Sequence, residues 1–276
     1  MFTLNCKGRL LLLDKPIVMG IINATPDSFY SGSRYTGTDA ILSVAEKMLN
    51  DGASILDIGG QSSRPGSKPV SADEEITRVI RPIEAITKRF PESYISVDTY
   101  YSIVAKEAVD AGAVIINDIS AGKLDDLMIP VVSSLQVPYV LMHMKGTPQT
   151  MQEKLHYENI SREILDFFIN KVQEIREAGI TDIIIDPGFG FGKAIGHNFQ
   201  LLKNFSLFKM LGFPLLAGLS RKSTIYKTLK ISPEDSMNGT TVLNTISLLN
   251  GASILRVHDV KEAAEAIKLF DAYQKA

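Results

Sequence analysis

The chain repeats one pattern eight times: a short apolar run that closes in polar or glycine residues, followed by a longer amphipathic stretch. Nearly every position within the runs is apolar, whereas a strand with one wet face alternates between apolar and polar residues. Continuous apolar runs of this length are typical of strands buried on both faces, as in a parallel sheet. We therefore predict eight parallel strands, at residues 17–23, 53–60, 94–99, 114–120, 138–144, 182–188, 214–220 and 253–259.

The stretches between these runs have the periodicity of helices. Residues 71–90 begin with Ser71 and Glu74 at the spacing of a capping box. Their apolar residues keep the i, i+3, i+4 spacing of one buried helix face; they are Ile76, Val79, Ile80, Ile83 and Ile86. Residues 157–178 and 259–274 show the same pattern, so we predict that helices alternate with the strands.

Eight strand–helix units without a break in composition favour a single α/β domain, a closed (β/α)8 TIM barrel over residues 1–276. An open, doubly wound sheet is the competing interpretation, although such sheets usually have fewer strands. The first sixteen residues (1–16) form a predicted β-hairpin, with strands at Phe2–Cys6 and Arg9–Leu13 and a turn at Lys7 and Gly8. We expect this hairpin to cap the N-terminal, bottom face of the barrel.

Composition excludes several classes of protein. The 29 Lys and Arg residues are balanced by 31 Asp and Glu residues, so the chain lacks the positive charge expected of a nucleic-acid-binding protein. No apolar run approaches the ~20 residues that cross a bilayer, and Leu10–Leu13 is too short for a signal peptide. Cys6 is the single cysteine, which excludes an internal disulfide and a cysteine-based metal cage. We expect a cytoplasmic protein that acts on small molecules, with neither nucleic acid nor a membrane as a partner.

Polar residues gather at the C-terminal ends of the predicted strands, where barrels of this kind carry their active sites. Any one of them is explained by the need of a strand end to meet water. Together they bring amides, carboxylates and cations to one rim, and this combination predicts an active site there. The residues are Asn23, Asp57, Asp98, Asn117, Asp118, His143, Asp186, Ser220, Arg221, Lys222, Arg256 and His258.

The loops after the first two strands support this interpretation. The first runs from Asn23 for about fifteen residues, although such connections usually have about 2–6, and long ones tend to bind ligands. The second, residues 59–66, offers Ser63, Arg64 and several glycines, a mixture that suits a phosphate or diphosphate. An ordinary turn with a solvated arginine is the alternative.

Three further features have competing interpretations. The loop 186–193 ends in Gly192 and Lys193 but lacks the glycine spacing and the following Ser or Thr of a nucleotide-binding loop, so nucleotide binding there is rejected. Lys222 lies beside Arg221, which fits either a Schiff-base lysine or an anion site. The four histidines lack close metal spacing, and His143, like the methionines beside it, is more often a packed core residue.

With these residues in view, the sequence resembles the dihydropteroate synthases, pterin-binding barrel enzymes of folate biosynthesis and the targets of sulfonamides. Two long segments carry the resemblance, MGIINATPDSF at 19–29 and LDIGGQSSRPG at 56–66. ISVDT, INDIS, LMHMKG, DPGFGFGK, GLSRKS and RVHDV follow in the order and rough spacing of the family. The resemblance implies a transferase that condenses 6-hydroxymethyl-7,8-dihydropterin diphosphate with 4-aminobenzoate, using Mg²⁺, and releases 7,8-dihydropteroate and pyrophosphate. It also implies a homodimer.

The resemblance assigns roles residue by residue. Asn23 would bind Mg²⁺, and the diphosphate would be bound by Ser63, Arg64, Arg256 and His258. The pterin pocket would contain Asp98, Asn117, Met142, Asp186 and Lys222. The 4-aminobenzoate side would be shaped by Phe29, Phe191, Ser220 and Arg221. The catalytic set would be Asn23, Arg64, Asp98, Lys222, Arg256 and His258. Lys222 would then be a hydrogen-bond donor rather than a nucleophile.

The sequence departs from the family pattern at a few positions. Gln61 stands where the family usually has Glu, Ser63 where Thr is more frequent, and Ser31 where the first loop usually has Asp. Two alternatives therefore stay open beside the synthase: a pterin-binding barrel of the methyltransferase type, and an inactive homologue that only binds a pterin. An aldolase-type barrel that uses Lys222 is a more distant third.

Overall fold

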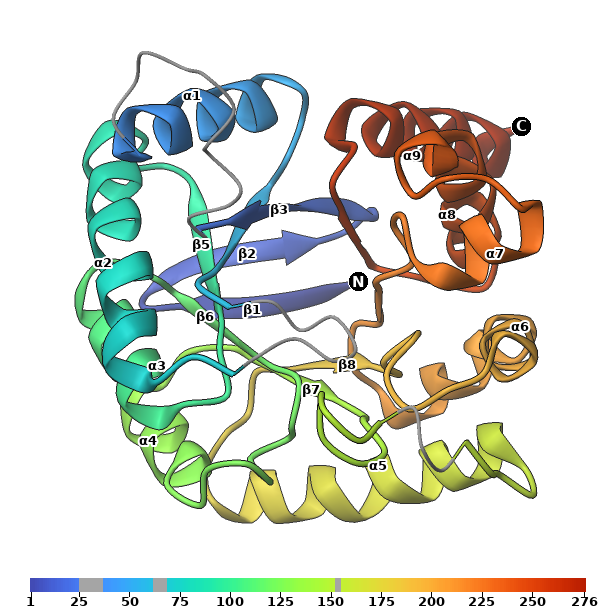
Figure 1. Ribbon diagram of the computed structural model, residues 1–276, viewed down its shortest axis with the longest axis horizontal. Helices are drawn as coiled ribbons and strands as arrows, with labels where there is room; N and C mark the ends of the chain where they lie inside the picture. The colour runs from blue at the N-terminus through green and yellow to red at the C-terminus, as the bar shows by residue number, and fades with distance from the viewer. Residues whose placement is uncertain (25–36, 62–68, 152–154) are drawn as a thin grey trace.

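A computed structural model describes residues 1–24, 37–61, 69–151 and 155–276 of the chain. Eight parallel strands form a barrel wall, and helices surround it (Figure 1). All eight predicted strands are present, most of them a residue or more shorter than predicted. They are β3 (Ile17–Asn23), β4 (Ile55–Gly59), β5 (Tyr94–Asp98), β6 (Ile115–Asp118), β7 (Tyr139–Met142), β8 (Ile183–Asp186), β9 (Leu216–Ala217) and β10 (Ile254–Val257).

The sheet closes on itself, which confirms the barrel and excludes the open sheet. The strands pair in the order β8-β7-β6-β5-β4-β3-β10-β9. A parallel bridge between Ile185 and Leu215 joins the two ends of this order, and the N–H of Ile185 donates to the carbonyl of Pro214 at 2.9 Å. The short β9 beside this bridge makes the seam of the barrel.

Helices follow the strands as the amphipathic stretches predict. The first turn of α2 (Ala72–Arg89) is capped by Ser71, whose hydroxyl accepts the N–H of Glu74. The buried face of this helix includes Val79, Ile83 and Ile86. The predicted helix at 157–178 begins at Ile160, and the one at 259–274 at Val260. The helices are α1 (Gly37–Asn50), α2 (Ala72–Arg89), α3 (Ser102–Asp110), α4 (Met128–Leu135), α5 (Ile160–Glu177), α6 (Ile195–Lys203), α7 (Ser223–Leu229), α8 (Met237–Leu249) and α9 (Val260–Lys275). None of the helices in the described ranges is long and apolar enough to cross a membrane.

The N-terminal hairpin forms as predicted, with β1 (Phe2–Cys6) antiparallel to β2 (Arg9–Leu13). In Figure 1 the two strands lie across the middle of the ring of helices. Their inward side chains pack on residues near the N-terminal ends of the barrel strands; this cluster includes Leu4, Cys6, Leu11, Leu13, Ile17, Ile55, Ile115, Ile184, Leu216 and Ile254. The hairpin therefore covers the N-terminal end of the barrel. The opposite end, the C-terminal rim, is the one at which ligands would enter.

Candidate active site

One ion-pair network crosses the C-terminal mouth of the barrel. Arg256, near the end of β10, donates from Nε to Oδ2 of Asp57 on β4 at 2.6 Å. Its Nη2 donates to Oδ2 of Asp98 on β5 at 2.5 Å. Asn117 of β6 donates from Nδ2 to the same Asp57 oxygen at 3.0 Å. The register explains the meeting, because Asp98 lies opposite Gly59 on one side and Asn117 on the other.

The charges in this network are buried and shift one another. Burial raises the pKa of Asp98 to about 7; the charge of Arg256 lowers it, and that of Asp57 raises it. Burial alone would lower the pKa of Arg256, but the carboxylates of Asp57 and Asp98 raise it above the usual value. The buried Oδ1 of Asp57 has no hydrogen-bond partner among the described residues. The mouth thus holds an arginine that keeps its charge and a buried acceptor that a ligand could pair.

A second group of polar side chains faces the loop after β8. Asp186 ends that strand, and its Oδ1 accepts the N–H of Gly188 at 2.7 Å. The Nζ of Lys222 donates to the carbonyl of Phe189 at 2.5 Å and lies 4.7 Å from the centre of the Phe191 ring. Burial lowers the pKa of Lys222 to about 8, and the charge of Asp186 opposes this shift. Burial also raises the pKa of Asp186. Lys222 is therefore held as a donor beside a carboxylate.

An apolar wall adjoins this pair. Met142 ends β7 opposite Asp186 in the register, and it packs in a buried cluster with Phe191. The other buried members of the cluster are Tyr100, Ile119, Met144 and Met151. An aromatic ring beside polar groups of fixed direction is the usual composition of a small-molecule site.

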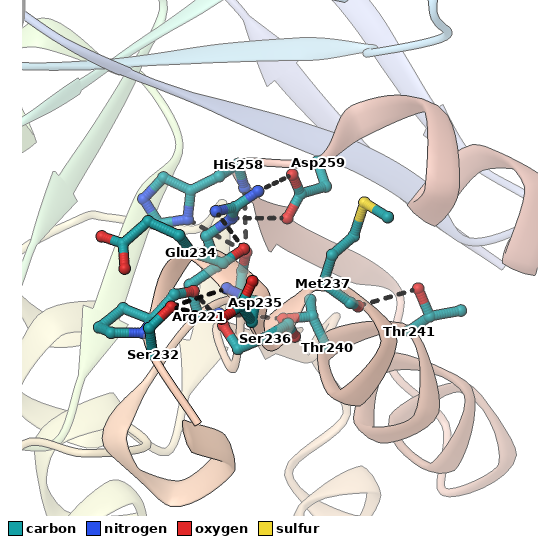
Figure 2. Close-up of polar contacts among 12 residues, drawn as sticks. Arg221, Ser232, Glu234, Asp235, Ser236, Met237, Thr240, Thr241, His258 and Asp259 are labelled. Carbon is teal, nitrogen blue, oxygen red and sulfur yellow. Dashed lines mark hydrogen bonds and ion pairs between the residues drawn. The ribbon is translucent and has the colours of Figure 1, made fainter. Parts of the chain in front are cut away.

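The loops after β9 and β10 are tied together by Arg221 and Asp259 (Figure 2). Arg221 donates from Nε and Nη2 to the two carboxylate oxygens of Asp259, at 2.9 and 2.6 Å, and from Nη1 to the carbonyl of Glu234 at 3.2 Å. Its backbone has a positive φ of 54°, and its N–H donates to Oγ1 of Thr240. The guanidinium of Arg221 is thus used within the protein to hold the loop.

His258 is oriented by Ser220 within this pair of loops. The N–H of His258 donates to Oγ of Ser220 at 3.1 Å, and the same Oγ lies 3.1 Å from His258 Nδ1. The Ser220 hydroxyl therefore contacts both the main chain and the ring of His258, which fixes the direction of the imidazole.

The remaining predicted residues divide into two groups. Asn23 ends β3 with an exposed side chain at the same rim, opposite Gly59 in the register. Phe29, Ser63 and Arg64 lie outside the described residues, as does Ser31. The structure therefore brings together the residues expected from the later strands and does not describe the two loops that carry the others.

Two buried charged residues in this part of the barrel, Asp57 and Lys193, lack a predicted role. Asp57 was noted only as a polar strand end, although it accepts from both Arg256 and Asn117. Its place within a run buried at every position was the available signal, since a buried carboxylate needs a partner. Lys193 has no role predicted from the sequence once nucleotide binding is rejected, and it is buried. Within the described ranges, no group of three or more His, Cys, Asp and Glu residues could hold a metal ion.

Comparisons with known proteins agree with this geometry. A family described as "Pterin binding enzyme" matches residues 19–258. The dihydropteroate synthase of Escherichia coli K12 is 42% identical over 268 residues, which cover 96% of this chain and 94% of the relative. The Yersinia pestis dihydropteroate synthase, solved with a sulfonamide drug, superposes with a TM-score of 0.94 at 40% identity and full coverage of both chains. The Xanthomonas albilineans enzyme with 4-aminobenzoic acid gives 0.93 at 40% identity, covering 99% of this chain and 98% of the other.

Proposed function

This chain belongs to the dihydropteroate synthases of the pterin-binding enzyme family, and from that premise we propose which of its residues perform the reaction. The activity is that of a transferase in folate biosynthesis, which condenses dihydropterin diphosphate with 4-aminobenzoate. The observation that supports our assignment best is the convergence of polar and charged side chains from separate strands and the loop after β9: Asp98, Asn117, Asp186, Lys222 and Arg256 meet at one rim.

The pterin ring binds between these groups. The carboxylate of Asp186 accepts from the 2-amino group and the adjacent ring N–H, while Asn117 donates and accepts along a mixed ring edge. Lys222 donates to the ring carbonyl or a ring nitrogen. A ligand that left such buried groups unpaired would lose roughly 1–3 kcal/mol for each one. The pocket therefore selects the pterin.

The chemical step separates charge, and the residues on the two sides of the mouth stabilise the separated charges. The bond between the pterin methylene carbon and the diphosphate oxygen breaks, and its electron pair leaves with pyrophosphate. The amine nitrogen of 4-aminobenzoate bonds to that carbon and loses a proton. Arg256 and His258, with Ser63 and Arg64, bind the departing oxygens, while the carboxylates of Asp98 and Asp186 favour the positive charge spread over the reduced ring.

Asn23 would hold the Mg²⁺ ion that the family resemblance implies. Its amide oxygen is a hard ligand, and its side chain is exposed at the rim beside the network of Arg256. Mg²⁺ commonly takes few protein ligands and completes its shell with substrate phosphates and water, so one asparagine oxygen could serve as its protein ligand here. When bound, Mg²⁺ neutralises part of the charge of the diphosphate.

The 4-aminobenzoate binds on the side of Phe191 and Ser220, together with Phe29. The phenyl ring of Phe191 offers an apolar face, and the X. albilineans relative binds 4-aminobenzoic acid. Arg221 shapes this side through its pair with Asp259, because its guanidinium already donates to that carboxylate and to Glu234.

The assembly we propose is a cytoplasmic homodimer of a single domain that spans residues 1–276. Support for the dimer comes from large apolar side chains exposed on the last three helices. These are Leu229, Met237, Val242, Leu249, Leu269 and Tyr273.

The function is tested by incubating the purified chain with dihydropterin diphosphate, 4-aminobenzoate and Mg²⁺ and separating the products by chromatography. We expect dihydropteroate and pyrophosphate in equal amounts. Tight binding of the pterin without product would show an inactive homologue, and methyl transfer from methyltetrahydrofolate would show the methyltransferase type. Trapping of a carbonyl substrate on Lys222 by borohydride would show an aldolase. Each of these results would contradict the proposal.

A further inference from the structure

Lys193 is a buried lysine without a carboxylate partner among the residues that the structure describes. Only 3% of the residue is exposed. Its Nζ donates to three main-chain carbonyls, those of Gly188 at 2.9 Å, Phe191 at 3.0 Å and His143 at 3.2 Å, and it lies 3.1 Å from Nδ1 of His143. Burying a lysine is costly unless its donors are paired, so a lysine in this position needs an explanation.

The loop that Lys193 holds has an unusual backbone. Gly188, Gly190 and Gly192 all have positive φ values, 71°, 86° and 66°. A Cβ atom on Gly188 would lie 2.1 Å from the carbonyl oxygen of His143, so the loops after β7 and β8 touch through their main chains. Such a glycine-rich segment gains little rigidity from its own sequence. Its conformation depends on the groups that bind its carbonyls.

Two lysines bind those carbonyls. Lys193 binds the carbonyls of Gly188 and Phe191, and Lys222 binds that of Phe189, which lies between them in the sequence. The N–H of Gly190 donates to Oδ1 of Asn198 at 2.7 Å. The ring of Phe191 lies 4.7 Å from Lys222 Nζ.

We propose that Lys193 is a positioning residue, which fastens the loop after β8 to His143 and so holds the ring of Phe191 at the 4-aminobenzoate side of the site. This inference rests on the function proposed above for Phe191. Lys193 contacts no reacting atom in this account and binds no phosphate. Its effect reaches the substrate through the main chain of residues 188–191.

Every hydrogen of the Lys193 ammonium group has an acceptor. An ammonium group has three hydrogens, and three carbonyls accept them. Burial, together with the charge of Lys193, lowers the pKa of His143 well below its usual value, which favours the neutral ring beside the ammonium. Burial also lowers the pKa of Lys193, and the charge of Asp186 opposes that shift.

The test is Lys193→Met, which keeps much of the length of the side chain and removes its donors. Lys203→Met, at an exposed position of α6, is the matched control. We expect the KM for 4-aminobenzoate to rise about tenfold, because the carbonyl bonds that hold Phe191 are lost. The Kd of the pterin, followed by its own fluorescence, should change less than about twofold, because Asp186 is fixed by β8. Hydrogen exchange of the main chain at 187–192 should become faster.

A double-mutant comparison separates positioning from general stability. In a Phe191→Leu background, Lys193→Met should add little to the KM for 4-aminobenzoate, because both changes act through one ring. Lys193→Gln, which keeps two N–H donors, should lie between wild type and Lys193→Met, and it serves as the variant if Lys193→Met does not fold.

Three results would overturn the proposal: unchanged hydrogen exchange in the loop, an unchanged KM for 4-aminobenzoate, or a loss of active protein with both substrate affinities unchanged. Failure of the proposed function is distinguishable, since the wild-type chain would then form no dihydropteroate.

Discussion

The guanidinium of Arg256 is oriented by two carboxylates, those of Asp57 and Asp98. It donates to both of them, so the protein itself fixes its direction. The two carboxylates also keep it protonated by raising its pKa. A fixed positive charge costs no reorganisation when pyrophosphate leaves, which is the condition under which such groups contribute most to catalysis.

Replacing this arginine tests its role. Arg256→Gln should lower kcat about 100-fold or more, because a charged donor to the leaving group is lost. Arg256→Lys should recover only part of the rate, since one ammonium cannot reproduce the two directed contacts. Steady-state kinetics measure both variants, and Arg176→Gln on the exposed face of α5 is the control. A kcat within about threefold of wild type in Arg256→Gln would contradict the assigned role.

Glu75 provides a second prediction at the residue scale, this time on stability. It is fully buried on α2, where it accepts from Nε2 of Gln61 at 2.8 Å. Burial, and after it the charge of Asp98, raises the pKa of Glu75 to about 8, above its model-compound value of 4.5. At pH values between these two, the folded state keeps the proton and the unfolded state loses it. Glu75 therefore makes the free energy of unfolding fall as pH rises through this window.

Glu75→Gln removes this titration and keeps the shape of the side chain. Relative to wild type, the variant should gain up to about 1.4 kcal/mol of unfolding free energy per pH unit between pH 5 and 8. Urea unfolding at several pH values measures the difference, and Glu84→Gln on the exposed face of α2 is the control. A difference between Glu75→Gln and wild type that stays constant with pH would show that Glu75 ionises normally in the folded state.

At the scale of elements, the strands and helices were predicted because continuous apolar runs alternate with stretches of helical periodicity. The sequence predicted β6 and β7 to run to 120 and 144, but they end at Asp118 and Met142. Hydropathy does not distinguish a buried loop from a strand, and Ile119 and Met144 are buried in loops. The pairing of Asp57 with Arg256 joins residues 199 apart in the chain, and no local pattern contains that information.

The burial of Lys193 could not be predicted from the sequence, for a different reason. A lysine after a glycine-rich loop is expected to be solvated or to bind an anion, and nothing in its neighbours indicates burial. Its three carbonyl acceptors arise only when the glycines adopt positive φ values beside the loop after β7. The candidate residues at the rim were predictable because parallel strands end together, whereas the contacts that orient them were not.

The link between the loops after β9 and β10 leads to a prediction about these elements. Asp259→Asn should weaken the contact with Arg221 and loosen Ser220 and His258 together, lowering kcat/KM about tenfold. Because Arg221→Gln removes the same interaction, the double variant should be little worse than either single one. Kinetics of the four proteins measure this coupling.

Asp271→Asn, at the far end of α9, is the matched control for Asp259→Asn, because it also loses an ion pair, the one with Lys275. Additive losses in the Arg221→Gln and Asp259→Asn pair would show that the two side chains act independently.

At the scale of the whole molecule, the two ends of the barrel have different roles. The hairpin end stabilises the fold by apolar packing, and the C-terminal rim carries the candidate site. The hairpin buries apolar strand starts and offers the N–H of Asn5 to Asp182 at 3.0 Å. The opposite end carries the buried charges. Their desolvation destabilises the fold, and their pairing offsets only part of that cost. The apolar contacts at the hairpin end and around the helices stabilise the fold against the remainder. This separation is the usual one in barrels of this kind.

The proposed dimer is tested on α8. Val242→Glu places a charge among exposed apolar side chains of the last helices and should shift the protein from dimer to monomer. Val44→Glu on α1, which is also exposed, should leave the mass unchanged. Light scattering coupled to size exclusion gives the mass of both variants. A wild-type protein that is already monomeric, or a Val242→Glu variant that stays dimeric, would contradict this interface.

We propose that this site ionises a dihydropterin diphosphate and transfers its methylene carbon to the amine of 4-aminobenzoate. Continuous measurement of pyrophosphate release, with one component omitted at a time, tests it most directly. We expect release that depends on Mg²⁺ and that matches dihydropteroate formation when 4-aminobenzoate is present. Tight pterin binding with no release under any of these conditions would contradict it and reduce the site to a binding pocket.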